Sequence, residues 1–98
     1  VDLVPPEIDA VRPAPGEVVD ANPTIRAAIR DMGAGIGREE DIEFVLDGRS
    51  LIVEYDPDAG LLHGHLSKDL VAGPHNLVVR VRDMSGNQAE ARSEFEVR

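Results

Sequence analysis

The sequence predicts an all-β fold, a sandwich of two packed sheets with about seven strands and Greek-key connections. The first observation behind this prediction is that apolar residues recur with a period of two along most of the chain. The second is that Gly, Pro, Asp and Asn separate the alternating runs at short, regular intervals. The only candidate for helix is residues 37–41, "GREED", which are long enough for a single turn.

The first four expected strands each place small or aliphatic residues on one face. They cover residues 7–11, 24–30, 41–47 and 51–55. The residues expected to face the core are Ile8, Ala10, Ile25, Ala27, Ile29, Ile42, Phe44, Leu46, Leu51, Val53 and Tyr55. Asp47-Gly48 predicts a tight hairpin between the last two of these strands.

The second half of the chain repeats the pattern in residues 61–66, 75–83 and 88–98. The expected core residues here are Leu62, Leu66, Leu77, Val79, Val81, Ala89, Ala91, Phe95 and Val97. Gly64 occupies an inward position, which indicates a close approach of another group or a bulge. On the outward face of the last strand, Glu90, Glu94 and Glu96 are expected to pair with Arg80 and Arg82.

Length and composition predict one domain with an aliphatic core. The chain has 98 residues, 42% of them hydrophobic, with one Tyr, two Phe and no Trp. We expect a linker over residues 1–6, because Pro5-Pro6 is stiff, and a single domain over residues 7–98. A first residue other than Met indicates a piece of a longer chain or a processed product.

Charge and composition exclude several classes of function. The formal net charge of −9 and the isoelectric point near 4.6 disfavour nucleic acid and anionic membrane surfaces as partners. The absence of cysteine excludes disulfides and thiolate metal sites. No apolar run is long enough to cross a membrane, so we expect no membrane insertion by this domain.

Several segments resemble bacterial Ig-like domains of the tandem-repeat type found in large surface or secreted proteins. The most specific is residues 73–87, which read G-x-H-x-aliphatic-x-V-x-V-x-D-x-x-G-N. The other segments are residues 5–19, 22–36, 44–48, 55–62 and 70–97. The family typically has Asp after the Gly-Ile of residues 35–36, where this chain has Gly37, so a role for that position does not carry over.

This resemblance implies an Ig-like Greek-key sandwich that serves as a structural or spacer module of a larger exported bacterial protein, without catalysis. Its expected place is extracellular, at the cell surface or in the periplasm, and its expected partners are neighbouring domains of the same chain. Two alternatives stay open. One is a module for adhesion or for binding a protein or polysaccharide, with or without calcium. The other is an accessory domain of a surface enzyme.

In such a sandwich, the loops after residues 24–30 and 77–82 emerge at the same end of the molecule. Asp47-Gly48 and Gly73-Pro74 are then expected at the opposite end, near Arg98. The side chains expected together at the first end are Asp2, Asp31, Asp56, Asp58, Asp83 and Asn87. Ordinary turn chemistry explains Asp at such positions, because its carboxylate accepts backbone N–H bonds.

The alternative for the same end is a calcium site. Its candidate ligands are Asp2, Asp31, Asp83 and Asn87, since Ca²⁺ takes six to eight oxygen ligands. The chain contains no D-x-D-x-D-G loop, and "YDPDAG" at residues 55–60 is expected to be a hairpin turn. No other cofactor is expected.

The histidines and aromatic residues argue against a catalytic centre or a sugar platform. His63 and His65 lie on one face of a strand and are expected to face solvent, without the four ligands of a structural zinc site. His75 is expected to pack against the preceding loop with its ring bonded to a backbone carbonyl. The three aromatic residues are all in phase with the core, and no serine has the context of a nucleophile.

Overall fold

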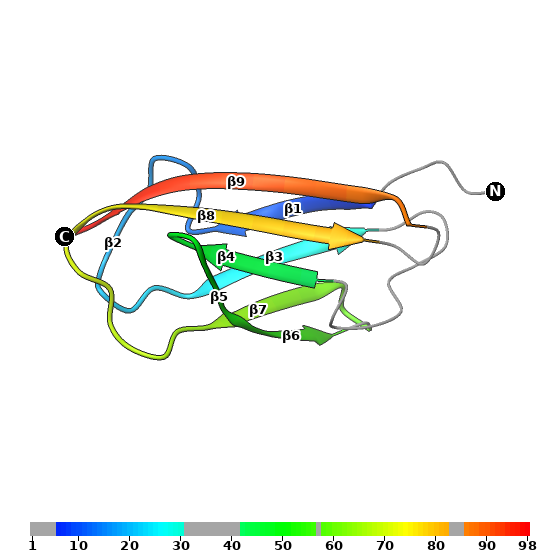
Figure 1. Cartoon of the computed structure of the whole chain (residues 1–98), viewed down its shortest axis with the longest axis horizontal. Coiled ribbons are helices and arrows are strands. Elements are labelled where there is room, and N and C mark those ends of the chain that lie inside the picture. The colour runs from blue at the N-terminus through cyan, green and yellow to red at the C-terminus, as the bar shows by residue number, and fades with distance from the viewer. Residues whose placement is uncertain (1–5, 31–41, 57, 83–85) are drawn as a thin grey trace.

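The computed structural model describes residues 6–30, 42–56, 58–82 and 86–98, which form a two-sheet β-sandwich (Figure 1). The strands of these residues are β1 (Glu7–Arg12), β2 (Val18–Val19), β3 (Ile25–Arg30), β4 (Ile42–Leu46), β5 (Arg49–Ser50), β6 (Ile52–Asp56), β7 (Leu61–His65), β8 (Gly73–Arg82) and β9 (Gln88–Val97). The predicted all-β class is confirmed.

The nine strands of the described residues are divided between two sheets, and the chain changes sheet after β1, β2, β3, β5 and β7. One sheet has the order β1-β3-β7-β6 and the other the order β2-β9-β8-β4-β5. Strand β2 runs parallel to β9, and the other pairs are antiparallel. The described residues form nine strands rather than about seven, because β2 and β5 have two residues each and are too short to show an alternating pattern.

The core between the sheets is aliphatic with two phenylalanines, as the composition predicts. Its buried members are Ile25, Ala27, Ile42, Phe44, Leu46, Leu62, Leu77, Val79, Val81, Phe95 and Val97. Every one of these residues was expected to face inward. The alternating pattern works because each sheet has one face on the core and one face toward solvent.

The prediction that Ala10 faces the core is wrong. The pairing of β1 with β3 shifts between Asp9 and Arg12, and Ala10 within the shift has a φ of +51°. Such a bulge inserts an extra residue and reverses the phase of the strand after it. Ala10 is therefore exposed, and Val11 packs against the core instead.

At Gly64 of β7, the Phe44 side chain comes close to the backbone, as the inward position of this glycine indicated. A Cβ added to Gly64 would lie 2.6 Å from a ring carbon of Phe44 and 3.1 Å from Ile25 Cγ2. Phe44 is fully buried, so its ring has no free space to retreat into. The glycine thus makes room for the largest side chain of the core.

The chain enters the sandwich at one end of the long axis and leaves it at the other (Figure 1). Strand β1 begins, and β3, β6 and β8 end, at what we call the N-terminal pole; β9 ends at the opposite C-terminal pole. The connection from β6 to β7 lies at the N-terminal pole, where Ile29 N donates to Gly60 O at 2.8 Å. The Asp47-Gly48 hairpin lies at the C-terminal pole, where Asp47 N donates to Asn76 O at 2.8 Å. This placement agrees with the sequence prediction.

Candidate functional site: a two-arginine groove and its surroundings

The proposed calcium ligands fall mostly on residues for which no structure is described. Asp2, Asp31 and Asp83 lie outside the described residues, and Asn87 lies half-buried just before β9 with an interaction partner of its own. Within residues 6–30, 42–56, 58–82 and 86–98, no group of three His, Cys, Asp or Glu side chains is placed to hold a metal ion. The calcium site therefore stays a prediction.

The turn after β6 uses its aspartate in the ordinary way. Asp56 Oδ1 accepts hydrogen bonds from Asp58 N at 3.1 Å and from Ala59 N at 3.3 Å. Gly60 closes the turn with a φ of +68°. This geometry is an Asx-turn, and β6 and β7 pair antiparallel on either side of it, which confirms the expected hairpin.

His63 and His65 lie on the exposed face of β7, as expected. Their ring centroids are 4.9 Å apart, and His65 Nε2 lies 3.2 Å from Glu54 Oε1 on the neighbouring strand β6. His65 and Glu54 keep about 42% and 71% of their side-chain surface exposed. The pair is a surface contact of small energetic weight.

His75 at the start of β8 is a buried tie between three segments. Its Nε2 donates to Val71 O at 2.7 Å, which confirms the expected carbonyl bond, and its Nδ1 lies 2.5 Å from Asp47 Oδ2. The other oxygen of Asp47 accepts from Asn76 N at 2.8 Å. The ring stacks on Phe95 at a centroid distance of 5.6 Å.

Both ring nitrogens of His75 face acceptors, so the protonated ring fits this position best. The hydrogen bond to Asp47 is the largest cause that raises the pKa of His75 above 6.5, followed by the bond to Val71, while burial opposes the shift. The sequence suggested the carbonyl bond but not the carboxylate partner. Asp47 reaches the histidine only because the β4–β5 hairpin lies beside the start of β8.

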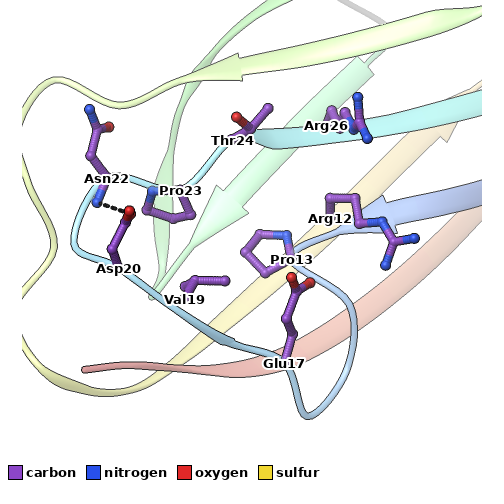
Figure 2. A pocket seen from close by; sticks show the side chains of 9 residues that line it. All are labelled: Arg12, Pro13, Glu17, Val19, Asp20, Asn22, Pro23, Thr24 and Arg26. Carbon is purple, nitrogen blue, oxygen red and sulfur yellow. Dashed lines mark hydrogen bonds between the residues drawn. The ribbon is translucent and has the colours of Figure 1, made fainter.

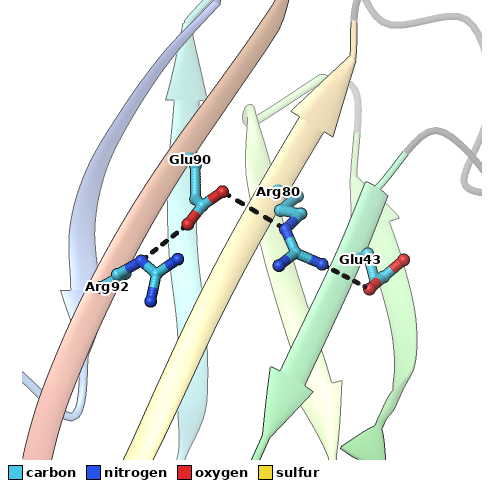
Figure 3. A network of polar contacts seen from close by, with 4 residues as sticks. All are labelled: Glu43, Arg80, Glu90 and Arg92. Carbon is cyan, nitrogen blue, oxygen red and sulfur yellow. Dashed lines mark hydrogen bonds and ion pairs between the residues drawn. The ribbon is translucent and has the colours of Figure 1, made fainter. Parts of the chain in front are cut away.

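The outer face of the five-stranded sheet carries a row of ion pairs (Figure 3). Arg80 on β8 lies 3.3 Å from Glu43 on β4 and 3.4 Å from Glu90 on β9, and Arg92 lies 2.7 Å from Glu90. The bond from Arg92 is the main cause that lowers the pKa of Glu90. The predicted pairing of Glu90 with Arg80 is confirmed. These ion pairs are exposed on the surface, so they neutralise one another and point to no binding or catalytic role.

A groove of about 510 Å³ lies between β1, β3 and the segment that joins them (Figure 2). It is lined by Arg12, Pro13, Glu17, Val19, Asp20, Asn22, Pro23, Thr24 and Arg26. Figure 2 shows the two arginines on one side and Asp20 with Asn22 on the other, with the prolines and Val19 between them. Ser93 Oγ donates to Pro13 O at 2.6 Å and holds this segment against β9.

A second groove of about 370 Å³ continues from the first across the four-stranded sheet. The two grooves share Thr24 and Arg26, and the second reaches β7 and β6. Its other lining residues are Glu54, Tyr55, Asp56, Leu61, Leu62 and His63. Arg26 therefore stands at the junction of two adjoining hollows, on a part of the surface that the sequence did not single out.

Sequence reasoning missed this site because it depends on the β1 bulge. In a regular antiparallel ladder continued from Asp9 and Ala28, Val11 would oppose Arg26; the bulge puts Arg12 there instead. Ala10, which adopts the positive φ, is an alanine and carries no turn signal. The alternating pattern alone therefore could not bring Arg12 and Arg26 together.

Comparison with known proteins gives structural likeness but no family. No protein-family model and no curated protein sequence matches the chain. Among solved structures, CopC from Methylosinus trichosporium OB3b is similar with a TM-score of 0.71 and 18% identity over 94% of this chain and 92% of that one.

Two larger proteins contain a segment of similar structure. Latent PorU from Porphyromonas gingivalis gives a TM-score of 0.68 and 25% identity, and the endo-β-1,4-mannanase from Thermotoga petrophila gives 0.72 and 12%. The matches cover 97% and 99% of this chain but only 10% and 20% of those proteins. The described residues include no helix of the length and hydropathy needed to cross a membrane. The chain is thus an all-β, two-sheet sandwich with a CopC-like Ig/cupredoxin-like fold, similar to small segments of large bacterial proteins.

Proposed function

We propose that this chain is a non-catalytic spacer or accessory module of a larger exported bacterial protein. The observation that carries the proposal is that the chain enters and leaves at opposite ends of a molecule with extents of 46 × 23 × 22 Å (Figure 1). A module threaded in this way separates its two neighbours by its own length. The segments of PorU and of the mannanase with similar structure support a place within a larger protein.

The interior of the sandwich suits a rigid separator. The ten-residue strands β8 and β9 pair along their whole length and run between the two poles. The core residues are packed between the two sheets. The hairpin at Asp47-Gly48 is held to β8 by the contact of Asp47 with His75. Such a unit resists bending because side chains in a close-packed core have no room to shift.

Single-molecule energy transfer tests the spacer role. The chain is placed between two identical reporter domains, each carrying one dye, and compared with a Gly/Ser linker of the same length. We expect a narrow distribution of donor–acceptor distances, resolved from the donor fluorescence lifetimes, for the folded chain and a broad one for the linker, which behaves as a flexible coil. A distribution as broad as that of the linker would contradict the proposal.

Export of the parent protein needs its own test. Fractionation of cells that express the full-length protein is expected to place it in the periplasmic, surface or culture fraction, as detected with an antibody against this module. Recovery with the cytosolic fraction alone would refute export and would leave the spacer geometry untouched.

Adhesion is the second candidate, and the groove at Arg12 and Arg26 is the observation that favours it. A binding module needs polar or charged groups that are free to contact a ligand, and no carboxylate among the described residues forms an ion pair with the two arginines of this groove.

A further inference from the structure

The groove at Arg12 and Arg26 carries two positive charges although the molecule as a whole is strongly negative. The chain has a formal net charge of −9, and Arg30, Arg80, Arg92 and Arg98 each pair with a carboxylate. In the part of the chain that the structure describes, no carboxylate forms an ion pair with Arg12 or Arg26. Among the described residues, these two cations thus have no neutralising carboxylate, although the chain as a whole is rich in anions.

The backbone brings these two cations together. The β1 bulge places Arg12 directly opposite Arg26 in the antiparallel pair of β1 and β3. Like charges at directly opposed positions destabilise a sheet, so this pair opposes folding unless something neutralises it. An anion between the two guanidinium groups would remove the repulsion.

The carboxylates that line the same groove are engaged elsewhere. Glu17 Oε1 accepts from Ala14 N at 2.8 Å, and Asp20 Oδ1 accepts from Asn22 N at 3.1 Å. Both bonds are local turn contacts, and they hold the two carboxylates on their own segment. Figure 2 shows Asp20 across the groove from the arginines, so the groove has a cationic side that is open to a ligand.

The rest of the lining indicates what kind of anion fits. Pro13, Val19 and Pro23 give the groove an apolar middle, and the adjoining groove adds Leu61, which is 49% exposed. The first groove, which both arginines line, has no aromatic side chain, so sugar rings would find no stacking surface in that groove; Tyr55 and His63 line only the second groove. Apolar contacts along an elongated path with cations at its centre suit a polypeptide that carries acidic and aliphatic residues.

We propose that the two adjoining grooves bind an extended acidic polypeptide segment, with one of its carboxylates held between the guanidinium groups of Arg12 and Arg26. Each planar guanidinium can donate two parallel hydrogen bonds to a carboxylate. The net charge of the chain repels a polyanion at long range, but this repulsion is screened beyond about 8 Å at physiological ionic strength. Binding then depends on the local pair of arginines.

The test is a titration of the isotope-labelled chain with capped hexaglutamate, followed by the amide signals in nuclear magnetic resonance spectra. We expect the largest shifts in residues 12–26 and 61–63. Arg12→Gln and Arg26→Gln should each weaken binding about tenfold, as expected for a charge-assisted hydrogen bond. Arg49→Gln is the matched control, because Arg49 is exposed and forms no ion pair with another described residue. It should leave the affinity unchanged.

Three results would overturn the proposal. Arg49→Gln weakening binding as much as Arg26→Gln would mean diffuse attraction to any cation. Capped hexaglutamine binding as well as hexaglutamate would mean that the arginines are irrelevant. Oligogalacturonate binding more tightly than hexaglutamate would assign the groove to an acidic saccharide instead. The amide spectra also report whether each variant is folded, so loss of binding is distinguished from loss of structure.

Discussion

At the scale of single residues, His75 connects three separate parts of the fold through its ring. It joins the β4–β5 hairpin, the loop before β8 and the ring of Phe95, and it does so with both ring nitrogens bonded. A neutral imidazole has one N–H donor, so it satisfies only one of the two acceptors. The protonated ring satisfies both, which couples the stability of the C-terminal pole to pH.

The stability of the chain should fall as the pH rises above neutrality. Because the pKa of His75 in the folded chain is raised above 6.5, its contribution is fully present below pH 6.5 and is lost as the pH passes through the raised value. Urea unfolding between about pH 5.5 and pH 9 measures the effect, because this range spans the ordinary histidine pKa and the values above it. Asp47→Asn keeps the acceptor for Asn76 but removes the charge, so its pH dependence should be shallower. Equal slopes in both proteins would refute the role of this pair.

Gly64 is the second residue at which a substitution has a specific expected effect on stability. Gly64→Ala brings a methyl group to 2.6 Å from the Phe44 ring, and overpacking of this kind costs about 1–3 kcal/mol. The free energy of unfolding in urea measures the loss. Phe44→Leu introduced beside Gly64→Ala should destabilise less than the sum of the two single substitutions, because the smaller side chain relieves the contact. Strict additivity would contradict the close-approach account.

At the scale of elements, the sequence predicted the strands whose patterns are long enough to read. A strand with one face on the core must alternate, so Phe44, Leu77 and Val79 could be assigned without a structure. Strands β2 and β5 could not, because two residues carry no alternation. The β1 bulge was also unreadable, because an alanine takes the unusual backbone conformation.

In the candidate site too, features formed by neighbouring residues could be predicted, whereas features formed by distant segments could not. The Asx-turn at Asp56 and the carbonyl bond of His75 are local, and the sequence indicated both. The partnership of His75 with Asp47 needs the β4–β5 hairpin to lie beside β8. The two-arginine groove needs the β1 bulge and also needs β1, β3 and the segment that joins them to lie around one hollow, so it appears only in the folded molecule.

Strand β2 closes the open edge of β9 with few hydrogen bonds. Glu96 N donates to Glu17 O at 3.0 Å, and Arg98 N donates to Val19 O at 3.1 Å. Glu96→Pro removes the first of these donors and should cost about 1 kcal/mol or more in the free energy of unfolding.

Glu94→Pro is the matched control for this edge. Glu94 has the same orientation on β9, and its carbonyl accepts from Gly16 N at 2.7 Å, a bond that proline retains. Thermal unfolding should therefore show a larger loss for Glu96→Pro than for Glu94→Pro. The reverse order would mean that β2 contributes nothing to this edge.

At the scale of the whole molecule, the decisive feature is that the chain enters the sandwich at one pole and leaves it at the other (Figure 1). Force applied to the two ends of the chain pulls β1 and β9 toward opposite poles, parallel to the strands of both sheets (Figure 1). The hydrogen bonds of β1 with β3 and of β2 with β9 are then sheared together rather than opened one at a time. A module loaded in this way stays folded until the whole sandwich gives way, as a spacer between neighbouring domains requires.

The measurement that tests this claim most directly is to pull a single chain by its two ends. We predict one cooperative unfolding step in which nearly all 98 residues are released, each adding about 3.3–3.6 Å of extended chain. The step should move to lower force in Glu96→Pro, because that substitution removes a sheared bond. Gradual extension, or release of the two sheets in separate steps at low force, would show that the sandwich does not act as a rigid link.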